Sequence, residues 1–174
     1  MTTTHRVLVA GMGNELLGDD GFGILAAQRC AQADLGADVT VVEAGIAGIG
    51  LVQDLMDRYD TVIVLDAVDR DGPPGSLHVL EITVPELSEL DGDQRRALLA
   101  DMHHTVPSKV LILARALGVL PGRSYLVGCQ PMSVELGAGL SAPVAAALDA
   151  VVDQVRQLAA RHHPTHASAR AGAA

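Results

Sequence analysis

Aromatic side chains are almost missing from this sequence, which contains no tryptophan and in which Phe, Trp and Tyr together make up 2% of 174 residues. A core without large rings has to be built from Val, Leu, Ile and Ala. Apolar residues reach 49% of the chain, which is enough for a globular protein of this length to bury one sizeable core. We therefore expect a single domain over residues 1–160.

Basic residues are also scarce, with 12 Lys and Arg against 21 Asp and Glu, for a formal net charge of −9. This balance argues against nucleic acid and anionic membrane surfaces as partners, because both repel an acidic protein. No apolar run reaches the roughly 18 residues that a membrane helix needs, and the first residues show no secretory signal pattern. We expect a cytoplasmic protein that does not enter the membrane.

Cysteine is limited to Cys30 and Cys129, which form neither a CxxC pair nor a metal-binding spacing. We interpret them as small buried residues of a protein kept in a reducing compartment. The final stretch, residues 161–174, loses apolar periodicity and fills with small residues. We expect it to be a disordered tail, with its scattered histidines carrying no metal.

Apolar patterning alternates between strands and helices along the rest of the chain. Runs of consecutive apolar residues predict strands buried on both faces, and helical spacing of apolar residues predicts helices between them. Such alternation is typical of a mostly parallel sheet with helices on both sides. The expected strands are 6–11, 39–44, 61–67, 77–82 and 124–129, and the expected helices are 20–33, 48–58, 106–117 and 142–160.

One connection is too short for a parallel crossover. Only residues 67–75 separate the third and fourth strands, whereas a parallel crossover takes a dozen or more residues and usually a helix. The fourth strand should therefore run antiparallel, at an edge of the sheet. We predict a three-layer α/β/α fold around a five-stranded mixed sheet, mostly parallel with one antiparallel strand.

Polar side chains gather where the strands of this fold should end. Asp20 follows the glycine-rich turn after the first strand, and Asp66 ends the third strand. The segment before the helix at 106–117 adds His103 or His104. In open α/β sheets, ligands bind at the carboxyl ends of the strands. Two carboxylates and an imidazole at that edge suit a divalent transition metal, although each alone could be a helix cap, a strand-end polar residue or a loop histidine.

Other motifs give weaker signals. The sequence GMGNEL has Leu16 where a dinucleotide fingerprint needs its third glycine, and GIAGIG at 45–50 lacks the Lys and Ser/Thr of a phosphate loop. The latter is better interpreted as a turn or a peptide-binding segment. Neither a G-x-S-x-G elbow nor an H-E-x-x-H zinc helix is present, which disfavours a serine hydrolase or an ordinary zinc protease.

Taken in order, these segments resemble the hydrogenase maturation proteases, endopeptidases that trim the large subunit of nickel–iron hydrogenases. The similarity extends over about residues 6–160. One departure is Ile46, where many members carry a Thr. The matching segments are GMGNELLGDDGFG (11–23), VEAGIAGIGL (42–51), VIVLDAV (62–68), HHTVPSKVLILARALG (103–118) and YLVGCQP (125–131).

The resemblance implies a function and a set of site residues. It implies removal of a C-terminal extension from the hydrogenase large-subunit precursor, with nickel carried by that substrate as the recognition mark and no resident metal. The family's metal-contacting and catalytic positions fall on Asp20, Asp66 and His103, with His104 as the neighbouring alternative. A non-proteolytic nickel-binding chaperone and a nucleotide-binding regulator remain as alternative functions at this point.

Overall fold

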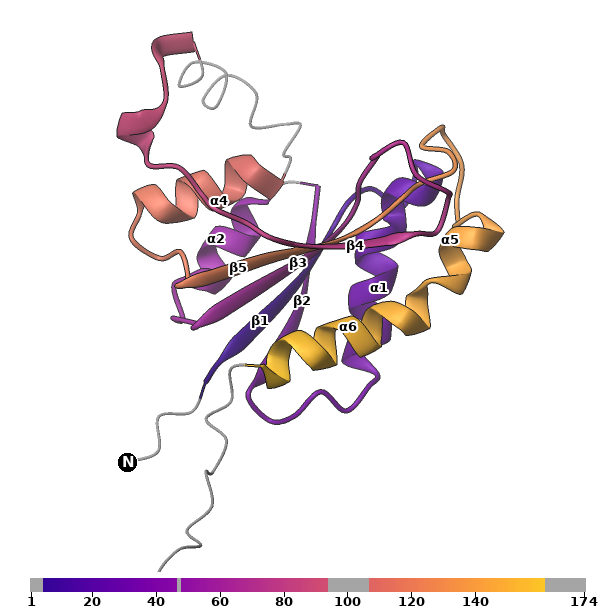
Figure 1. The fold of residues 1–174 in the computed structure, drawn as a ribbon, viewed down its shortest axis with the longest axis horizontal. Coiled ribbons are helices and arrows are strands. Elements are labelled where there is room, and N and C mark those ends of the chain that lie inside the picture. Colours follow the sequence, from indigo (N-terminus) through magenta and orange to yellow (C-terminus); the bar gives the residue numbers. More distant parts are fainter. Residues whose placement is uncertain (1–4, 47, 94–106, 162–174) are drawn as a thin grey trace, which may run out of the picture.

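The computed structural model describes residues 5–46, 48–93 and 107–161. Strands and helices alternate in it as the patterning predicts (Figure 1). The strands are β1 (Val7–Met12), β2 (Val39–Gly45), β3 (Thr61–Ala67), β4 (Leu77–Glu81) and β5 (Arg123–Cys129). The helices are α1 (Phe22–Ala31), α2 (Ile49–Leu55), α4 (Pro107–Ala116), α5 (Ala142–Ala146) and α6 (Leu148–Ala160), with short 3₁₀ turns η1 (Gly18–Gly21) and η2 (Leu87–Glu89).

The five strands form one sheet in the order β2-β1-β3-β5-β4. β1 pairs in parallel with β2 and β3, and β3 pairs in parallel with β5. β4 is antiparallel to β5 and lies at the edge, which confirms the orientation predicted from the short link before it. The strand order reverses between β1 and β3, so a crevice for ligands is expected above their carboxyl ends.

Helices cover both faces of the sheet and create two apolar cores (Figure 1). α1 and α6 pack on one face, where Phe22 is the largest buried side chain. α2 and α4 pack on the other face through residues such as Leu51 and Leu111. All six residues of β1 are buried, which explains why this central strand is apolar without interruption. The predicted three-layer α/β/α fold is confirmed.

Two glycines let α1 lie directly on the sheet. A Cβ atom at Gly23 would stand 2.1 Å from the carbonyl oxygen of Met12 and 2.2 Å from that of Leu65. A Cβ atom at Gly11 would in turn stand 2.2 Å from the carbonyl oxygen of Gly23. The helix start therefore contacts the ends of β1 and β3 backbone against backbone, and only glycine permits this approach.

Two helix predictions need correction. The helix expected at 20–33 begins as the 3₁₀ turn η1 and becomes α-helical only at Phe22. The single helix expected at 142–160 is two helices that meet at Ala147. There the N–H of Ala147 bonds to the carbonyl of Val144 at 3.1 Å, three residues back, which is the tighter 3₁₀ pattern. Apolar spacing cannot distinguish that local tightening from a continuous helix.

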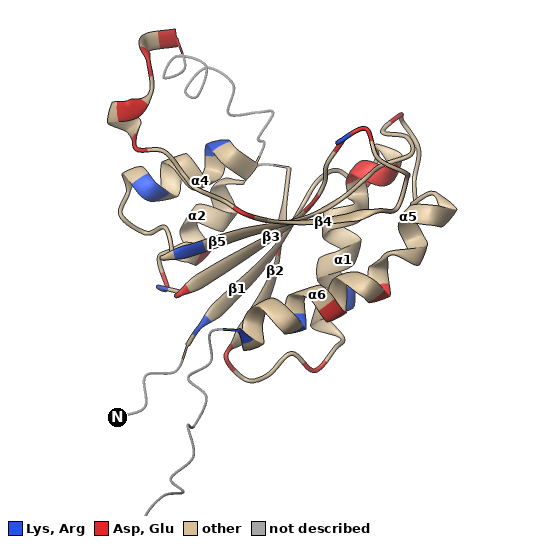
Figure 2. Cartoon of the chain, in the orientation of Figure 1, with Lys and Arg blue, Asp and Glu red and all other residues tan. Residues whose placement is uncertain are grey.

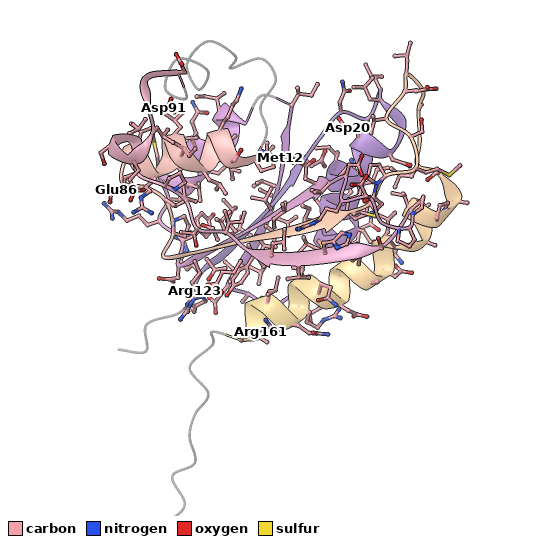
Figure 3. All side chains as sticks on the ribbon, turned by 45° about the horizontal axis from the view of Figure 1, so that its top comes forward. Met12, Asp20, Glu86, Asp91, Arg123 and Arg161 are labelled. Carbon is pink, nitrogen blue, oxygen red and sulfur yellow. The ribbon has the colours of Figure 1, made fainter. Side chains whose placement is uncertain are left out.

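The first strand starts, and the last helix ends, far from the carboxyl ends of the strands. Val7 begins β1, whereas Met12 ends it next to η1. Arg161, which follows α6, lies across the molecule from Asp20 (Figure 3). Within the described residues, no helix is both long and apolar enough to cross a membrane. The tail predicted at 161–174 lies outside the described residues beyond Arg161.

Candidate functional site

The turn after β1 carries Asp20 into the crevice between β1 and β3. Its backbone closes through the N–H of Asp20, which donates to the carbonyl of Leu17 at 3.1 Å. The Asp20 carboxylate accepts the backbone N–H of Asn14 at 2.9 Å. No side-chain cap bond is made at η1 or α1, so Asp20 is not a helix cap. Figure 2 shows η1 as an acidic turn at the start of α1.

Gly13 lies between the backbone of Asp20 and the carboxylate of Asp66. Its φ of +125° is a conformation that favours glycine, and a Cβ atom there would stand 1.9 Å from the carbonyl oxygen of Asp20. The same Cβ position lies 3.8 Å from the Oδ1 atom of Asp66. Asp66 and the Asp20 backbone therefore flank one glycine, at the carboxyl ends of β3 and β1, as the topology predicted.

Asp66 has few partners for its charge. It is half-buried, and its carboxylate accepts one hydrogen bond within the described part of the chain, from the N–H of Ala67 at 2.9 Å. Burial and, to a lesser extent, the negative charge of Asp20 raise the pKa of Asp66, the Ala67 N–H opposes both, and the net result is a pKa of about 7. Two neighbouring carboxylates whose negative charges repel each other favour binding a proton or a metal.

The histidine of the predicted site is not placed. His103 and His104 both lie outside the described residues, so the choice between them stays a prediction. Among the described residues, no group of three or more His, Cys, Asp and Glu side chains is arranged to hold a metal ion. The structure thus brings Asp20 and Asp66 together as a pair.

The neighbouring carboxylate, Asp19, has a different environment. Its side chain is 1% exposed and turns toward the segment 131–141, which follows β5. It accepts the backbone N–H groups of Met132 (2.8 Å), Ser133 (3.1 Å) and Ser141 (2.6 Å), and the Ser141 hydroxyl at 2.8 Å. Burial works to raise the pKa of Asp19, but the hydrogen bonds from Ser141 and the other donors outweigh it and lower the pKa.

The burial of Asp19 is a finding of the structure that the sequence analysis did not predict. Its donors lie more than a hundred residues further along the chain, so no local pattern announces them. Asp19 and Asp20, although adjacent in sequence, therefore have different roles. Asp19 fastens a distant loop beneath the turn, and Asp20 lies in the crevice.

A hollow of about 490 Å³ opens beside the carboxylate pair, between the ends of β1 and β2. The N–H of Gly13 donates to the carbonyl of Gly45 at 3.4 Å and joins its two walls. Ile46, where the resemblance led us to expect a Thr, is 49% exposed and presents an apolar side chain here. The lining residues are Gly13, Asn14, Glu15, Leu16, Ile24, Glu43, Ala44, Gly45 and Ile46.

Comparison with known proteins identifies the family that this fold and crevice define. Residues 24–158 match the HycI model, described as hydrogenase maturation protease. The hydrogenase expression/formation protein HupD of Rhizobium leguminosarum bv. viciae is 36% identical over 150 residues, which cover 85% of this chain and 71% of that protein.

Solved structures agree with this match. The hydrogenase 2 maturation peptidase from Thaumarchaeota archaeon SCGC_AB-539-E09 superposes with a TM-score of 0.66 at 40% identity, covering 88% of this chain and 97% of that one. The hydrogenase maturating endopeptidase HybD from E. coli gives a TM-score of 0.65 at 29% identity, covering 86% and 89%. The chain belongs to the hydrogenase maturation protease family, whose members are peptidases of the hydrolase class.

Proposed function

We propose that this enzyme removes the C-terminal extension of a hydrogenase large-subunit precursor after nickel has been inserted. In this proposal Asp20, Asp66 and His103 contact the nickel that the precursor carries. The nickel is thus part of the substrate, and the cleaved bond lies close to it. Bound next to a scissile carbonyl, the metal would supply Lewis acidity.

The observation that carries the proposal is the carboxylate pair at the crevice between β1 and β3. Asp20 and Asp66 converge from two strand ends, and Asp66 has one hydrogen-bond donor from the described residues. Such a pair is short of positive charge, and a divalent cation would supply it. An imidazole from His103 would complete two oxygen ligands and one nitrogen ligand, which suits a borderline cation such as nickel and leaves positions for the precursor's own groups.

A ligand set without a thiolate should hold free metal weakly. We therefore expect the purified protein to contain little metal, in keeping with nickel arriving on the substrate. Elemental analysis of protein purified without chelators measures this. Zinc bound in a one-to-one ratio would count against nickel on the substrate and would favour a hydrolase with its own metal.

The hollow beside the pair supports a peptide as the substrate. Its floor includes the apolar side chain of Ile24, and its walls carry Leu16 and Ile46 together with the acids Glu15 and Glu43. An extended segment with apolar and basic side chains fits such a lining. The hollow is shared with the turn that carries Asp20, so a bound segment would run directly to the proposed nickel contact.

Incubation with a nickel-loaded large-subunit precursor tests the proposal. Mass spectrometry should show loss of one C-terminal peptide with the wild-type enzyme, and the intact precursor when nickel is omitted. Cleavage separates a peptidase from a nickel-binding chaperone, and nickel dependence separates both from a nucleotide-binding regulator. Cleavage of the nickel-free precursor at the same rate would refute nickel recognition.

A further inference from the structure

Exposed apolar side chains gather on two loops next to the carboxylate pair. Ten large apolar side chains are exposed among the described residues, and four of them lie within residues 14–17 and 131–141, which we call the docking loops. Leu136 is 87% exposed, which is the largest fraction of the ten. The four are Leu16 (67%), Met132 (64%), Val134 (51%) and Leu136.

Backbone hydrogen bonds join the later docking loop both to the earlier one and to the adjoining 3₁₀ turn η1. The N–H of Gly137 donates to the carbonyl of Leu16 at 2.9 Å, and the N–H of Gly18 donates to the carbonyl of Gly137 at 2.8 Å. The N–H of Asp19 donates to the carbonyl of Ser133 at 3.0 Å. Figure 1 shows the later loop (orange) passing beside the start of α1. Two segments far apart in sequence thus form one ordered surface.

Asp19 holds this surface from beneath. Its buried carboxylate accepts four hydrogen bonds, and the donors belong to Met132, Ser133 and Ser141 of the later loop. Hydrogen bonds to an ionised group are stronger than those between neutral groups. A loop held this firmly keeps its apolar side chains in water instead of folding them inward. Such preorganisation favours a binding surface, because less conformational freedom is lost when the partner arrives.

We propose that Leu16, Met132, Val134 and Leu136 form the surface that docks the folded body of the hydrogenase large-subunit precursor. This inference rests on the proposed function. Exposed apolar patches with a polar border mark protein interaction sites, and this patch is continuous with the proposed substrate site, because Leu16 lines both the patch and the hollow. A precursor seated in the hollow must pass over these loops.

The acidic residues on the docking loops indicate which charged residues the partner surface should carry. Glu15 and Glu135, both exposed, accompany the apolar side chains on the docking loops. The matching face of the precursor should therefore be an apolar patch accompanied by Lys or Arg. Opposite charges at the margin of an interface raise the association rate, and salt screens their effect.

Affinity for the nickel-loaded precursor, measured by biolayer interferometry, tests docking directly. The test variant is Met132→Ser with Leu136→Ser. The control, which changes the same two residue types, is Met56→Ser with Leu117→Ser, because Met56 (54%) and Leu117 (53%) are also more than half exposed and follow α2 and α4. The test variant should raise both Kd and KM at least about tenfold, with kcat within twofold of the wild type. The control should change neither Kd nor KM.

The outcomes distinguish this inference from the proposed function. An unchanged Kd in a test variant that circular dichroism shows to be folded would overturn the docking surface, even if the wild type cleaves normally. A wild type that binds tightly through these residues but cleaves nothing would overturn the proposed function and leave docking supported. A wild type that sediments as a dimer, which the test variant turns into a monomer, would show a second copy on the patch and would also overturn the inference.

A charge variant provides a second measurement. Glu135→Lys should weaken precursor binding by about three- to tenfold at low salt and by less at high salt. Glu81→Lys, at an exposed position on β4, is the matched control and should have no effect. Equal effects of the two variants would contradict a basic margin on the partner.

Discussion

Asp19 is buried and Asp66 is half-buried, and their pKa values move in opposite directions. Four hydrogen-bond donors surround Asp19 and lower its pKa despite burial. For Asp66, burial and the charge of Asp20 outweigh the one donor that the described residues provide, the N–H of Ala67, and the pKa rises to about 7. A buried carboxylate with all its partners serves the fold, whereas one left short of them is available to a ligand.

The largest effect on activity is expected at the proposed nickel contacts, which include Asp66, the carboxylate with few hydrogen-bond donors. Asp20→Asn, Asp66→Asn and His103→Ala should each lower kcat/KM for the nickel-loaded precursor at least about 100-fold, because each removes one contact to a single ion. Circular dichroism should show folded protein in every case. Normal processing by both aspartate variants would mean that the proposed site is wrong.

His104→Ala is the matched control for the histidine and should keep most of the activity. The family resemblance assigns the histidine by counting seven residues back from Val110, which α4 places in the core. Loss of processing in His104→Ala together with retention in His103→Ala would shift the histidine assignment by one residue.

Removal of the fully partnered carboxylate should mainly cost stability. Asp19→Asn should lower the free energy of unfolding by about 2–4 kcal/mol, because it removes the charge and leaves buried donors without an acceptor. Urea denaturation measures it. Asp69→Asn, which alters an exposed carboxylate bonded to Gln130 at 2.8 Å, is the control and should lower the free energy of unfolding far less than Asp19→Asn.

The stability that Asp19 contributes should depend on pH in a defined direction. Its folded-state pKa lies below the ordinary 3.8, so the stabilisation is complete above that value and is lost as pH falls through the lowered pKa. The difference in the free energy of unfolding between wild type and Asp19→Asn should therefore narrow as pH falls below 3.8 and Asp19 takes up its proton. If the difference in the free energy of unfolding stays the same in acid, the destabilisation by Asp19→Asn comes from altered packing and not from the lost charge.

Substitution of Asp66 should change the free energy of unfolding by a smaller amount and in the opposite direction. Its folded pKa of about 7 lies above the ordinary 3.8, so the ionised group destabilises the fold above pH 7, and this cost is relieved as pH falls toward 4. Asp66→Asn should raise the free energy of unfolding by about 1–3 kcal/mol at pH 8 and leave it nearly unchanged at pH 4. Equal stability of variant and wild type at pH 8 would contradict the raised pKa.

The smallest effect concerns the C-terminal residues. Removing residues 162–174 should leave processing and the unfolding temperature unchanged, because that stretch lacks the apolar periodicity that docking on the core would need. Thermal unfolding and the precursor assay measure both quantities. A marked loss in either would restore the histidines of the tail as candidate ligands.

Local pattern was sufficient for most of the fold. The bounds of β3 match the prediction, because a continuous apolar run ends at a polar residue there, and the antiparallel β4 followed from the length of one link. The meeting of Asp20 with the end of β3 followed from strand order. These features depend on neighbours in sequence or on topological rules, and both can be recognised in one chain.

The support beneath the site could not be predicted. The four bonds of Asp19 join residues more than a hundred positions apart, and nothing in the sequence DDG separates a buried acid from an exposed one. The exposed apolar side chains of residues 131–141 would conventionally be assigned to a core. Long-range hydrogen bonds determine the burial of Asp19 and the exposure of these apolar side chains. Such bonds depend on how the loops pack and not on the periodicity within each loop.

The position of the chain ends has a practical consequence. β1 begins, and Arg161 lies, at the end of the molecule away from Asp20 (Figures 1 and 3). A purification handle, a fluorophore or a link to a solid support added beyond either of them starts from the side opposite the crevice. Immobilised in this way, the enzyme would present the docking loops and the carboxylate pair outward, which suits a reusable column that finishes precursors passed over it.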